Sequence, residues 1–432
     1  MNQPAKYTFT VAVTVVIANM IGTGVFGSLG FQVGPIPSGF SILILWLAGG
    51  VVSLCGAFVY AELATTLKES GGEYLFLSRI FHPSIGFLSG WISAVWGFAG
   101  ALSANAIIIG AYSHEVLGLP EKVISCASIV LVTGVHLFGV KVGGITQNFL
   151  TGVKLTLIFM FCLAPFLFGG NRSGIDFTPT SIDFDLILSS GFAVSLVYVV
   201  YAYSGWNAAA YIAGSIDNPQ RNLPRALIIG TITVTLIYLA LNFVFMYVTP
   251  FDLLLNKKEV GNIAASQIFG NSIGLILSGF LSFALLSTLS AMTIAGPRVT
   301  EAMGKDFSSL NFFSRTNKFG MPHVAMLVQA VWAIFLILFS SFTEIIGNIA
   351  VSLSIFTLMS IIGLFVLRNK NKGKPRVFST PLYPLTPIIF IAVTLWMIIH
   401  ESISKPSVLL YSFGSVAIGL ILYFFAVKKN NA

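Results

Sequence analysis

The chain is built from long apolar runs, and its polar residues gather in short segments between them. Each run of about 20 apolar residues is long enough to cross the hydrocarbon core of a bilayer as a helix. The segments between the runs are all shorter than 20 residues, which leaves no room for a soluble domain. The pattern predicts an all-α polytopic membrane protein with a single domain over 1–432. The twelve predicted spans lie at about 8–33, 39–66, 84–117, 122–141, 144–169, 187–214, 224–248, 262–303, 322–341, 343–367, 380–400 and 405–427.

The composition agrees with a membrane protein. Hydrophobic residues make up 56% of the 432 residues and charged residues only 9%, whereas ordinary globular domains carry roughly a quarter charged residues. The net charge of +8 is spread over short clusters between spans, such as the five basic residues from Arg368 to Arg376, which is typical of cytoplasmic loops rather than of a nucleic-acid surface. Cys55, Cys126 and Cys162 lie singly inside apolar runs, so neither a disulfide framework nor a metal site is expected, and no cofactor either.

The basic residues also predict the orientation. If the N-terminus is cytoplasmic, 17 Lys and Arg fall in inside loops and tails, 5 fall in outside loops, and Lys154 falls within a span. Cytoplasmic loops of membrane proteins carry such an excess. Both termini are therefore predicted to be cytoplasmic, and the short loops and tails favour a bacterial inner membrane. The first run extends too far past Lys6 for a cleaved signal peptide.

The first span contains a predicted break. Its middle holds two glycines around a threonine, Gly22-Thr23-Gly24, and each glycine costs a helix interior about 1 kcal/mol against alanine. The alternative is close packing of helices through small residues, which is common in membranes. The sequence of this span alone leaves both interpretations open.

The sixth span contains a similar interruption, with Ser204, Gly205 and Asn207 inside an apolar run. Spans one and six occupy corresponding positions if ten helices form two five-helix halves. These halves would cover about 8–169 and 187–367, with two additional helices over 380–427. Paired interruptions at corresponding positions indicate a transporter site built on inverted repeats.

The chemistry of a broken helix favours a zwitterion. Carbonyl groups are exposed where the first half ends, and N–H groups where the second half begins. The carbonyl end suits an ammonium group, and the N–H end, with its partial positive charge, suits a carboxylate. Irregular backbone at membrane depth is tolerated where it lines such a cavity. An amino acid presents both groups close together.

Four stretches resemble the amino acid–polyamine–organocation transporters, in particular the branch of the L-amino-acid transporters. The family patterns are I-G-S-G-I-F, Y-A-E-L followed by S-G-G-x-Y, F-A-Y-x-G-W-N, and N-P-x-R-N-L-P-R-A. The matching stretches are IGTGVF at 21–26, YAEL at 60–63 with SGGEY at 70–74, AYSGWN at 202–207 and NPQRNLPRA at 218–226.

The resemblance implies a leucine-transporter fold, with a 5+5 inverted repeat plus two helices, and transport by alternating access. It also implies a substrate site at the two breaks. Carbonyls around the first half-helices would meet the amino group, N–H groups around Gly22 to Gly24 would meet the carboxylate, and Tyr201 would stand as an aromatic gate. The implied substrate-binding residues are Met20, Ile21, Gly22, Thr23, Gly24, Tyr201, Ala202, Tyr203, Ser204 and Gly205.

Lys154 is the one basic residue predicted to lie inside a span. If the fifth helix begins near Gly144, Lys154 lies about 15 Å along it, close to the bilayer midplane, where a lone lysine is costly and a functional candidate. The alternative is a helix that begins near Thr151, with Lys154 snorkelling to the cytoplasmic surface.

The resemblance extends to this lysine through the stretch from Gln147 to Leu155. In the L-amino-acid branch a lysine here points at the first and eighth helices, where sodium-coupled relatives hold a cation. Its ammonium group would bond to carbonyls near Ile17 to Met20 and to the hydroxyl of Ser287 or Ser290. Exchange or proton coupling is therefore expected rather than sodium coupling.

The predicted function is secondary transport of amino acids, and the chain is not expected to be an enzyme. A membrane-embedded enzyme is the first alternative, but the five histidines are scattered and neither an HExxH nor a GxSxG motif is present. A passive channel is the second. His136 is expected to be structural, while Glu62, Arg298 and Glu301 fall at predicted cytoplasmic helix ends, where loop or gate contacts are expected.

Overall fold

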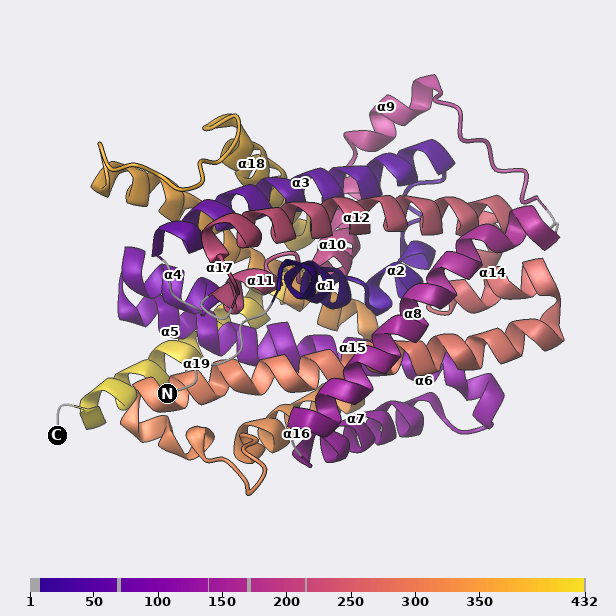
Figure 1. The fold of residues 1–432 in the computed structure, drawn as a ribbon. Coiled ribbons are helices and arrows are strands. Elements are labelled where there is room, and N and C mark those ends of the chain that lie inside the picture. The colour runs from indigo at the N-terminus through magenta and orange to yellow at the C-terminus, as the bar shows by residue number, and fades with distance from the viewer. Residues whose placement is uncertain (1–7, 68–70, 139, 169–171, 214–215, 431–432) are drawn as a thin grey trace.

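The computed structural model describes residues 8–67, 71–138, 140–168, 172–213 and 216–430, and within them the chain forms helices and no strand (Figure 1). The helices are α1 (Phe9–Met20), α2 (Thr23–Gly27), α3 (Gly39–Leu67), α4 (Gly72–Ile80), α5 (Pro83–Ile92), α6 (Ala99–Leu117), α7 (Glu121–Leu137), α8 (Val140–Phe168), α9 (Ser181–Ile187), α10 (Ser190–Tyr203), α11 (Ala208–Tyr211), α12 (Pro219–Val248), α13 (Phe251–Leu254), α14 (Val260–Phe269), α15 (Asn271–Asp306), α16 (His323–Phe339), α17 (Phe342–Lys370), α18 (Leu385–Ser404) and α19 (Pro406–Asn430). Short 3-10 helices cover Leu29–Phe31 and Ser308–Ser314, and a π-helical segment covers Ser93–Phe98.

The predicted polytopic membrane architecture is confirmed. By length and composition, eight helices in the described part of the chain can cross a membrane, or nine if the bent pair α9 and α10 forms one span. The helices α7 and α16 each reach 17 residues. Each of the twelve predicted spans overlaps at least one of the helices named above. The number of crossings, twelve, stays a prediction.

Two predicted spans have wrong boundaries. The eighth was predicted over 262–303, but Gly270 adopts a φ of +79° and separates α14 from α15, which pack against each other. Glycine readily adopts this conformation, and such residues commonly end helices. The sixth was predicted from 187, but α9 ends there, and α10 begins after Ser189, at an angle of 64° to α9. The Ser189 side chain caps α10 by accepting from the Phe192 N–H at 3.1 Å.

The two interrupted spans lie at the centre of the bundle. The first consists of α1 and α2, and the second of α10 and α11. The helix α12 packs on α1 and on α3, and α10 packs on α2 and α3, while α15 packs on α6, α7 and α8. In Figure 1 the long helices α3, α12 and α15 run along the molecule, with α4 at one end and α9 at the other.

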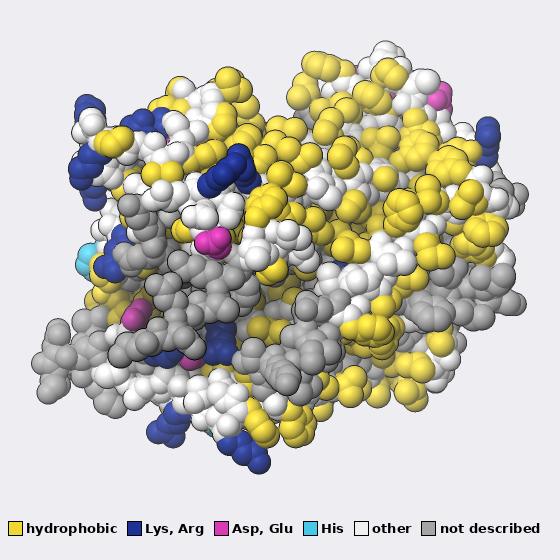
Figure 2. All heavy atoms as spheres, viewed as in Figure 1, with side chains coloured by type: hydrophobic (Ala, Val, Ile, Leu, Met, Phe, Trp, Pro, Cys, Tyr) yellow, Lys and Arg dark blue, Asp and Glu magenta, His cyan; other side chains and the backbone are white. Residues whose placement is uncertain are grey.

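The outer surface carries many exposed apolar side chains. On α8, for example, Phe159, Phe166 and Leu167 are 60% exposed or more. Apolar patches of this extent mark a surface that meets another apolar phase, which for this helical bundle is lipid. On the face shown in Figure 2, apolar side chains gather over the upper centre and over the side away from α4, and most Lys and Arg lie toward the end that carries α4.

Candidate functional site

The first span is broken where the glycines predicted it. The helix α1 ends at Met20, and α2 begins at Thr23. Between them, Ile21 and Gly22 are extended, with φ/ψ of −74°/93° and −128°/−158°. All five residues of α2 are buried. The break therefore lies inside the protein, where carbonyls at the end of α1 and N–H groups at the start of α2 have no partner within their own helices and bond to other groups.

The second span is broken at Ser204 and Gly205, between α10 and α11. Gly205 has a φ of +103°, a conformation that favours glycine. A Cβ atom on Gly205 would also lie 2.9 Å from the Asn19 carbonyl oxygen. Because Asn19 belongs to the last turn of α1, the two breaks lie against each other.

Gly24 joins the two broken helices directly. A Cβ atom at this position would stand 2.5 Å from the Cα atom and 2.7 Å from the Cβ atom of Ala202. The glycine therefore permits α2 to touch α10, as the alternative interpretation of close packing through small residues required. Both interpretations of the glycine pair, a helix break and close helix packing, therefore apply. Gly22 lies in the break, and Gly24 lies in the contact between α2 and α10.

A side chain from α6 holds the start of α2. The Oδ1 atom of Asn105 accepts from the Thr23 N–H at 3.2 Å and from the Thr23 hydroxyl at 2.6 Å. The Nδ2 atom of Asn105 donates to the Ala101 carbonyl and, at 3.2 Å, to the Tyr201 hydroxyl. Asn105 thus connects Thr23 with Tyr201, one residue from each interrupted span. Sequence analysis missed Asn105, although an asparagine within an apolar span was an available signal.

The hydroxyl of Tyr238, on α12, is hydrogen-bonded to a carbonyl at each of the two breaks. It lies 2.5 Å from the Met20 carbonyl oxygen and 2.8 Å from that of Ala202. A hydroxyl has one proton to donate, so the two carbonyls share it and keep acceptor capacity for another donor. The Tyr238 ring packs edge-on against Trp46 and Tyr203 at centroid distances of 5.3 and 5.0 Å. Nothing in the spacing along the chain pointed to Tyr238.

The two breaks enclose a small void of about 10 Å³, roughly the space of a single water molecule. Seven of the ten predicted substrate-binding residues line it: Met20, Gly22, Thr23, Gly24, Tyr201, Ala202 and Ser204. Ile21 instead turns its carbonyl toward Lys154. The Tyr203 hydroxyl donates to the Trp46 carbonyl at 3.1 Å, away from the void. Gly205 lines the larger cavity described next.

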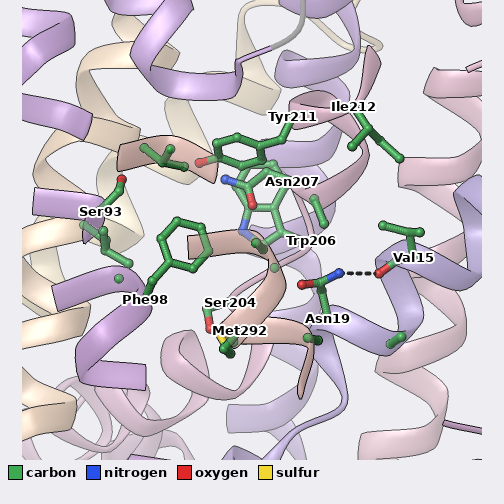
Figure 3. Close-up of a pocket in the computed structure, with 18 of the residues that line it drawn as sticks. Val15, Asn19, Ser93, Phe98, Ser204, Trp206, Asn207, Tyr211, Ile212 and Met292 are labelled. Atoms are coloured by element: carbon green, nitrogen blue, oxygen red, sulfur yellow. Dashed lines mark hydrogen bonds between the residues drawn. The ribbon is translucent and has the colours of Figure 1, made fainter. Parts of the chain in front are cut away.

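A cavity of about 1300 Å³ adjoins the void. Four residues line both spaces and form their boundary: Asn19, Tyr201, Ser204 and Met292. Figure 3 shows Ser204 and Met292 on one side of the cavity, with Phe98, Trp206, Asn207 and Tyr211 around it. Glu73 and Tyr74 of α4 also line the cavity, so it extends from the breaks toward the α4 end of the bundle.

Lys154 is buried, with 1% of its surface exposed. Its Nζ atom donates to the Ile21 carbonyl at 2.5 Å, and lies 3.4 Å from both the Ala18 carbonyl and the Thr288 hydroxyl. The predicted direction, toward the first and eighth spans, is confirmed, and the snorkelling alternative is wrong. A cation is favourable here because the carbonyl end of α1 carries partial negative charge. The side chains of Gln147 and Asn148 lie outside the described residues.

The predicted hydroxyl partners of Lys154 are wrong. Thr288 takes that place, while the Ser290 hydroxyl lies 2.8 Å from Nε2 of His136. The Ser287 hydroxyl is buried and has no hydrogen-bond partner among the described residues. Successive residues of a helix point about 100° apart, so the prediction found the correct turn of α15 and missed the residue that faces Lys154.

The predicted loop or gate residues form ion pairs near the α4 end. Glu62 accepts from Arg368 at 2.6 and 2.8 Å and from the Thr380 N–H at 2.7 Å. Glu301 pairs with Arg298 and with Lys305, each at 2.7 Å. These contacts tie α3 to α17 and strengthen the last turns of α15.

Known proteins resemble the chain over nearly its whole length. Residues 8–425 match a family model described as amino acid permease. The serine/threonine exchanger SteT of Bacillus subtilis is 28% identical, and the alignment covers 98% of this chain and 96% of that protein. The b(0,+)-type amino acid transporter 1 of Mus musculus is also 28% identical, over 96% of this chain and 86% of its own. The human cystine/glutamate transporter is 24% identical, over 93% of this chain and 81% of its own.

Proposed function

The chain belongs to the amino acid permease family, and we propose that it exchanges amino acids across the membrane by alternating access at its two helix breaks. The relatives above include a serine/threonine exchanger and two further amino acid transporters. A passive channel and a membrane-embedded enzyme are not favoured by these names. In the described residues no group of three His, Cys, Asp or Glu could hold a catalytic metal.

The observation that carries the proposal is the void shared by both breaks. The carbonyls of Met20 and Ala202 meet at the Tyr238 hydroxyl, and the N–H end of α2 begins at Thr23 beside them. An ammonium group would replace the single Tyr238 proton as the main donor to these carbonyls. A carboxylate would lie at the N–H groups that open α2. The void of about 10 Å³ must widen to take these groups, so substrate binding and movement of the half-helices are one event.

Lys154 supports a sodium-independent cycle. Its ammonium group is bonded to the Ile21 carbonyl and supplies one positive charge at the carbonyl end of α1. A sodium ion at the same place would bring the same charge and need the same oxygen atoms. We propose that Lys154 takes the place of that ion and links α1 to α15 through Thr288.

The cavity supports a cytoplasm-facing conformation. It extends from the breaks toward the α4 end, and on the visible face most basic side chains lie toward that end (Figure 2). Basic residues favour the cytoplasmic side. We propose that this end is cytoplasmic, that both termini lie there, and that the protein resides in a bacterial inner membrane. The two halves of the inverted repeat would cover 8–169 and 187–367, with 380–427 added.

Counterflow tests the proposal. Purified protein is placed in vesicles loaded with unlabelled L-alanine, L-serine and L-threonine, and uptake of the same labelled amino acids is followed in sodium and in choline buffer. An exchanger accumulates label in loaded vesicles and not in empty ones, equally in both buffers. Equal uptake by loaded and empty vesicles would indicate a channel, and strict dependence on sodium would remove the role given to Lys154.

A further inference from the structure

The void at the breaks has no charged lining. Its eleven described lining residues are all neutral: Asn19, Met20, Gly22, Thr23, Gly24, Asn105, Tyr201, Ala202, Ser204, Thr288 and Met292. Lys154 lies behind Ile21 and Thr288, and its donors point to their oxygens. The backbone groups of an amino acid fit this lining, as proposed above. The side chain has to extend past the boundary residues into the adjoining cavity.

The cavity wall nearest the boundary is apolar or weakly polar. Phe98 projects into the cavity from the end of the π-helical segment just before α6, and Met292 lies beside Ser204 in Figure 3. Ala291 and Ala295 of α15 and Ile349 of α17 continue the lining. None of these apolar side chains carries a charge, or a hydrogen-bond donor, that could pair with a charged substrate side chain. A side chain that leaves the void first meets this neutral wall.

The cavity has one acidic residue among those described, Glu73, and one oxygen of its carboxylate already accepts three hydrogen bonds. Glu73 is 3% exposed. Its Oε1 atom accepts from the Tyr60 hydroxyl at 2.6 Å, from the Thr357 hydroxyl at 2.9 Å and from Asn207 at 3.4 Å. These donors come from α3, α17 and the second break, so Glu73 ties three elements together. A substrate cation would have to pass the neutral wall first and then share this carboxylate with three donors of the protein.

The one arginine among the described residues of the cavity, Arg298, is already paired with a carboxylate, and it lies away from the boundary. Arg298 donates to Glu301 at 2.7 Å, and it follows Met292 by six residues, or about 9 Å along α15. His136 is 1% exposed, and its Nε2 atom is taken by Ser290. No free cation for an acidic side chain is therefore present beside the boundary in the described part of the chain.

From the charged groups around the void and the cavity we infer that the substrates are amino acids with uncharged side chains. Basic and acidic amino acids are excluded at the boundary, which is formed by Asn19, Tyr201, Ser204 and Met292. The inference rests on the proposed function and narrows it. A charge that leaves water has to be paired or pays a large desolvation penalty. The relatives do not decide this matter, because their names cover serine, threonine, cystine and glutamate.

A counterflow panel tests the inference on the wild-type protein. Vesicles are loaded with L-alanine and given labelled L-alanine, L-threonine, L-leucine, L-lysine, L-arginine or L-glutamate. Neutral amino acids should accumulate, and kcat/KM for lysine, arginine and glutamate should be at least about 100-fold lower, the order expected for an unpaired buried charge. Uptake of lysine or glutamate at rates near that of alanine overturns the inference while the proposed function stands. Absence of counterflow with every amino acid overturns the proposed function itself.

Two variants test whether charged side chains are excluded at the boundary. Met292→Asp puts a carboxylate at the boundary and should raise lysine uptake at least tenfold relative to alanine. Met321→Asp is the matched control, because Met321 lines the same cavity near Arg298, away from the boundary, and it should leave lysine excluded. Equal gains in both variants would contradict exclusion at the boundary. If the wild type accepts lysine and Glu73→Gln abolishes that uptake, Glu73 recognises the cation and the inference is wrong.

Discussion

Asn105 holds the first residue of α2 with two hydrogen bonds to one oxygen atom. Thr23 and Asn105 are separated by 82 positions in the chain, so their contact exists only in the folded bundle. The glycines around Thr23 could be recognised from the sequence because they act locally on the helix. Tyr238 could not, and Asn105 could be noticed only as a polar residue in an apolar span, because the partners of both residues depend on which way distant helices are turned.

Removing the Asn105 side chain should disable the N–H end of the first break. Asn105→Ala leaves the buried Thr23 N–H without a partner, which costs about 1–3 kcal/mol. We expect the exchange KM to rise at least tenfold, with the protein still folded. Uptake kinetics in vesicles measure this, with Asn371→Ala, in the turn after α17, as the control. An unchanged KM for Asn105→Ala would show that the carboxylate binds elsewhere.

Lys154→Ala should impair transport more than substrate binding. The ammonium group contacts Ile21, Ala18 and Thr288, and it does not line the void. We expect substrate binding to change less than threefold while the exchange rate falls at least tenfold, because α1 loses its link to α15. Lys122→Ala is the matched control, since the Lys122 ammonium donates to the Leu338 carbonyl at an exposed position, far along the chain from both breaks. Full exchange by Lys154→Ala would remove the proposed role.

At the scale of the helices, the two breaks could be predicted because a pair of glycines or a Ser-Gly pair weakens a helix wherever it stands. The separation of α14 from α15 could not, because Gly270 lies between two apolar stretches that look continuous. The π-helical segment Ser93–Phe98 likewise leaves no mark in the hydrophobic pattern. The N–H groups around Gly24 were expected to meet the carboxylate, and the contact with Ala202 adds a packing reason for a glycine at this position.

The contact between α2 and α10 should fail when Gly24 gains a single methyl group. Gly24→Ala places a Cβ atom 2.5 Å from the Ala202 Cα atom, and backbone cannot move aside as a flexible side chain can. We expect a loss of thermal stability and of exchange. Gly134→Ala is the control, because a Cβ atom there meets nothing within 4 Å and alanine favours a helix by about 1 kcal/mol. Equal melting temperatures of the two variants would contradict direct helix contact at Gly24.

At the scale of the molecule, apolar periodicity and basic-residue counts were sufficient for the class of fold. Each predicted span overlaps a helix, since a bilayer requires long apolar helices wherever the backbone crosses it. The cavity and the collapsed void could not be predicted, because they depend on how the halves pack in this conformation. The orientation rests on charge and stays a prediction.

Labelling of single cysteines tests the orientation. In a protein whose Cys55, Cys126 and Cys162 are replaced by alanine, Pro179→Cys and Lys372→Cys place thiols in exposed loops at predicted opposite sides. A membrane-impermeant maleimide added to intact cells should label position 179 and spare 372. Labelling of 372 alone would reverse the assignment and move the cavity to the outside.

The central claim is exchange of amino acids at the paired breaks without sodium. Its most direct test is efflux from vesicles that contain the wild-type protein and labelled L-threonine, in choline buffer free of sodium. We predict that unlabelled external L-threonine accelerates release of the label at least tenfold, because a loaded site returns faster than an empty one. Release that is unchanged by external amino acid, or that is accelerated only when sodium is present, would contradict the account.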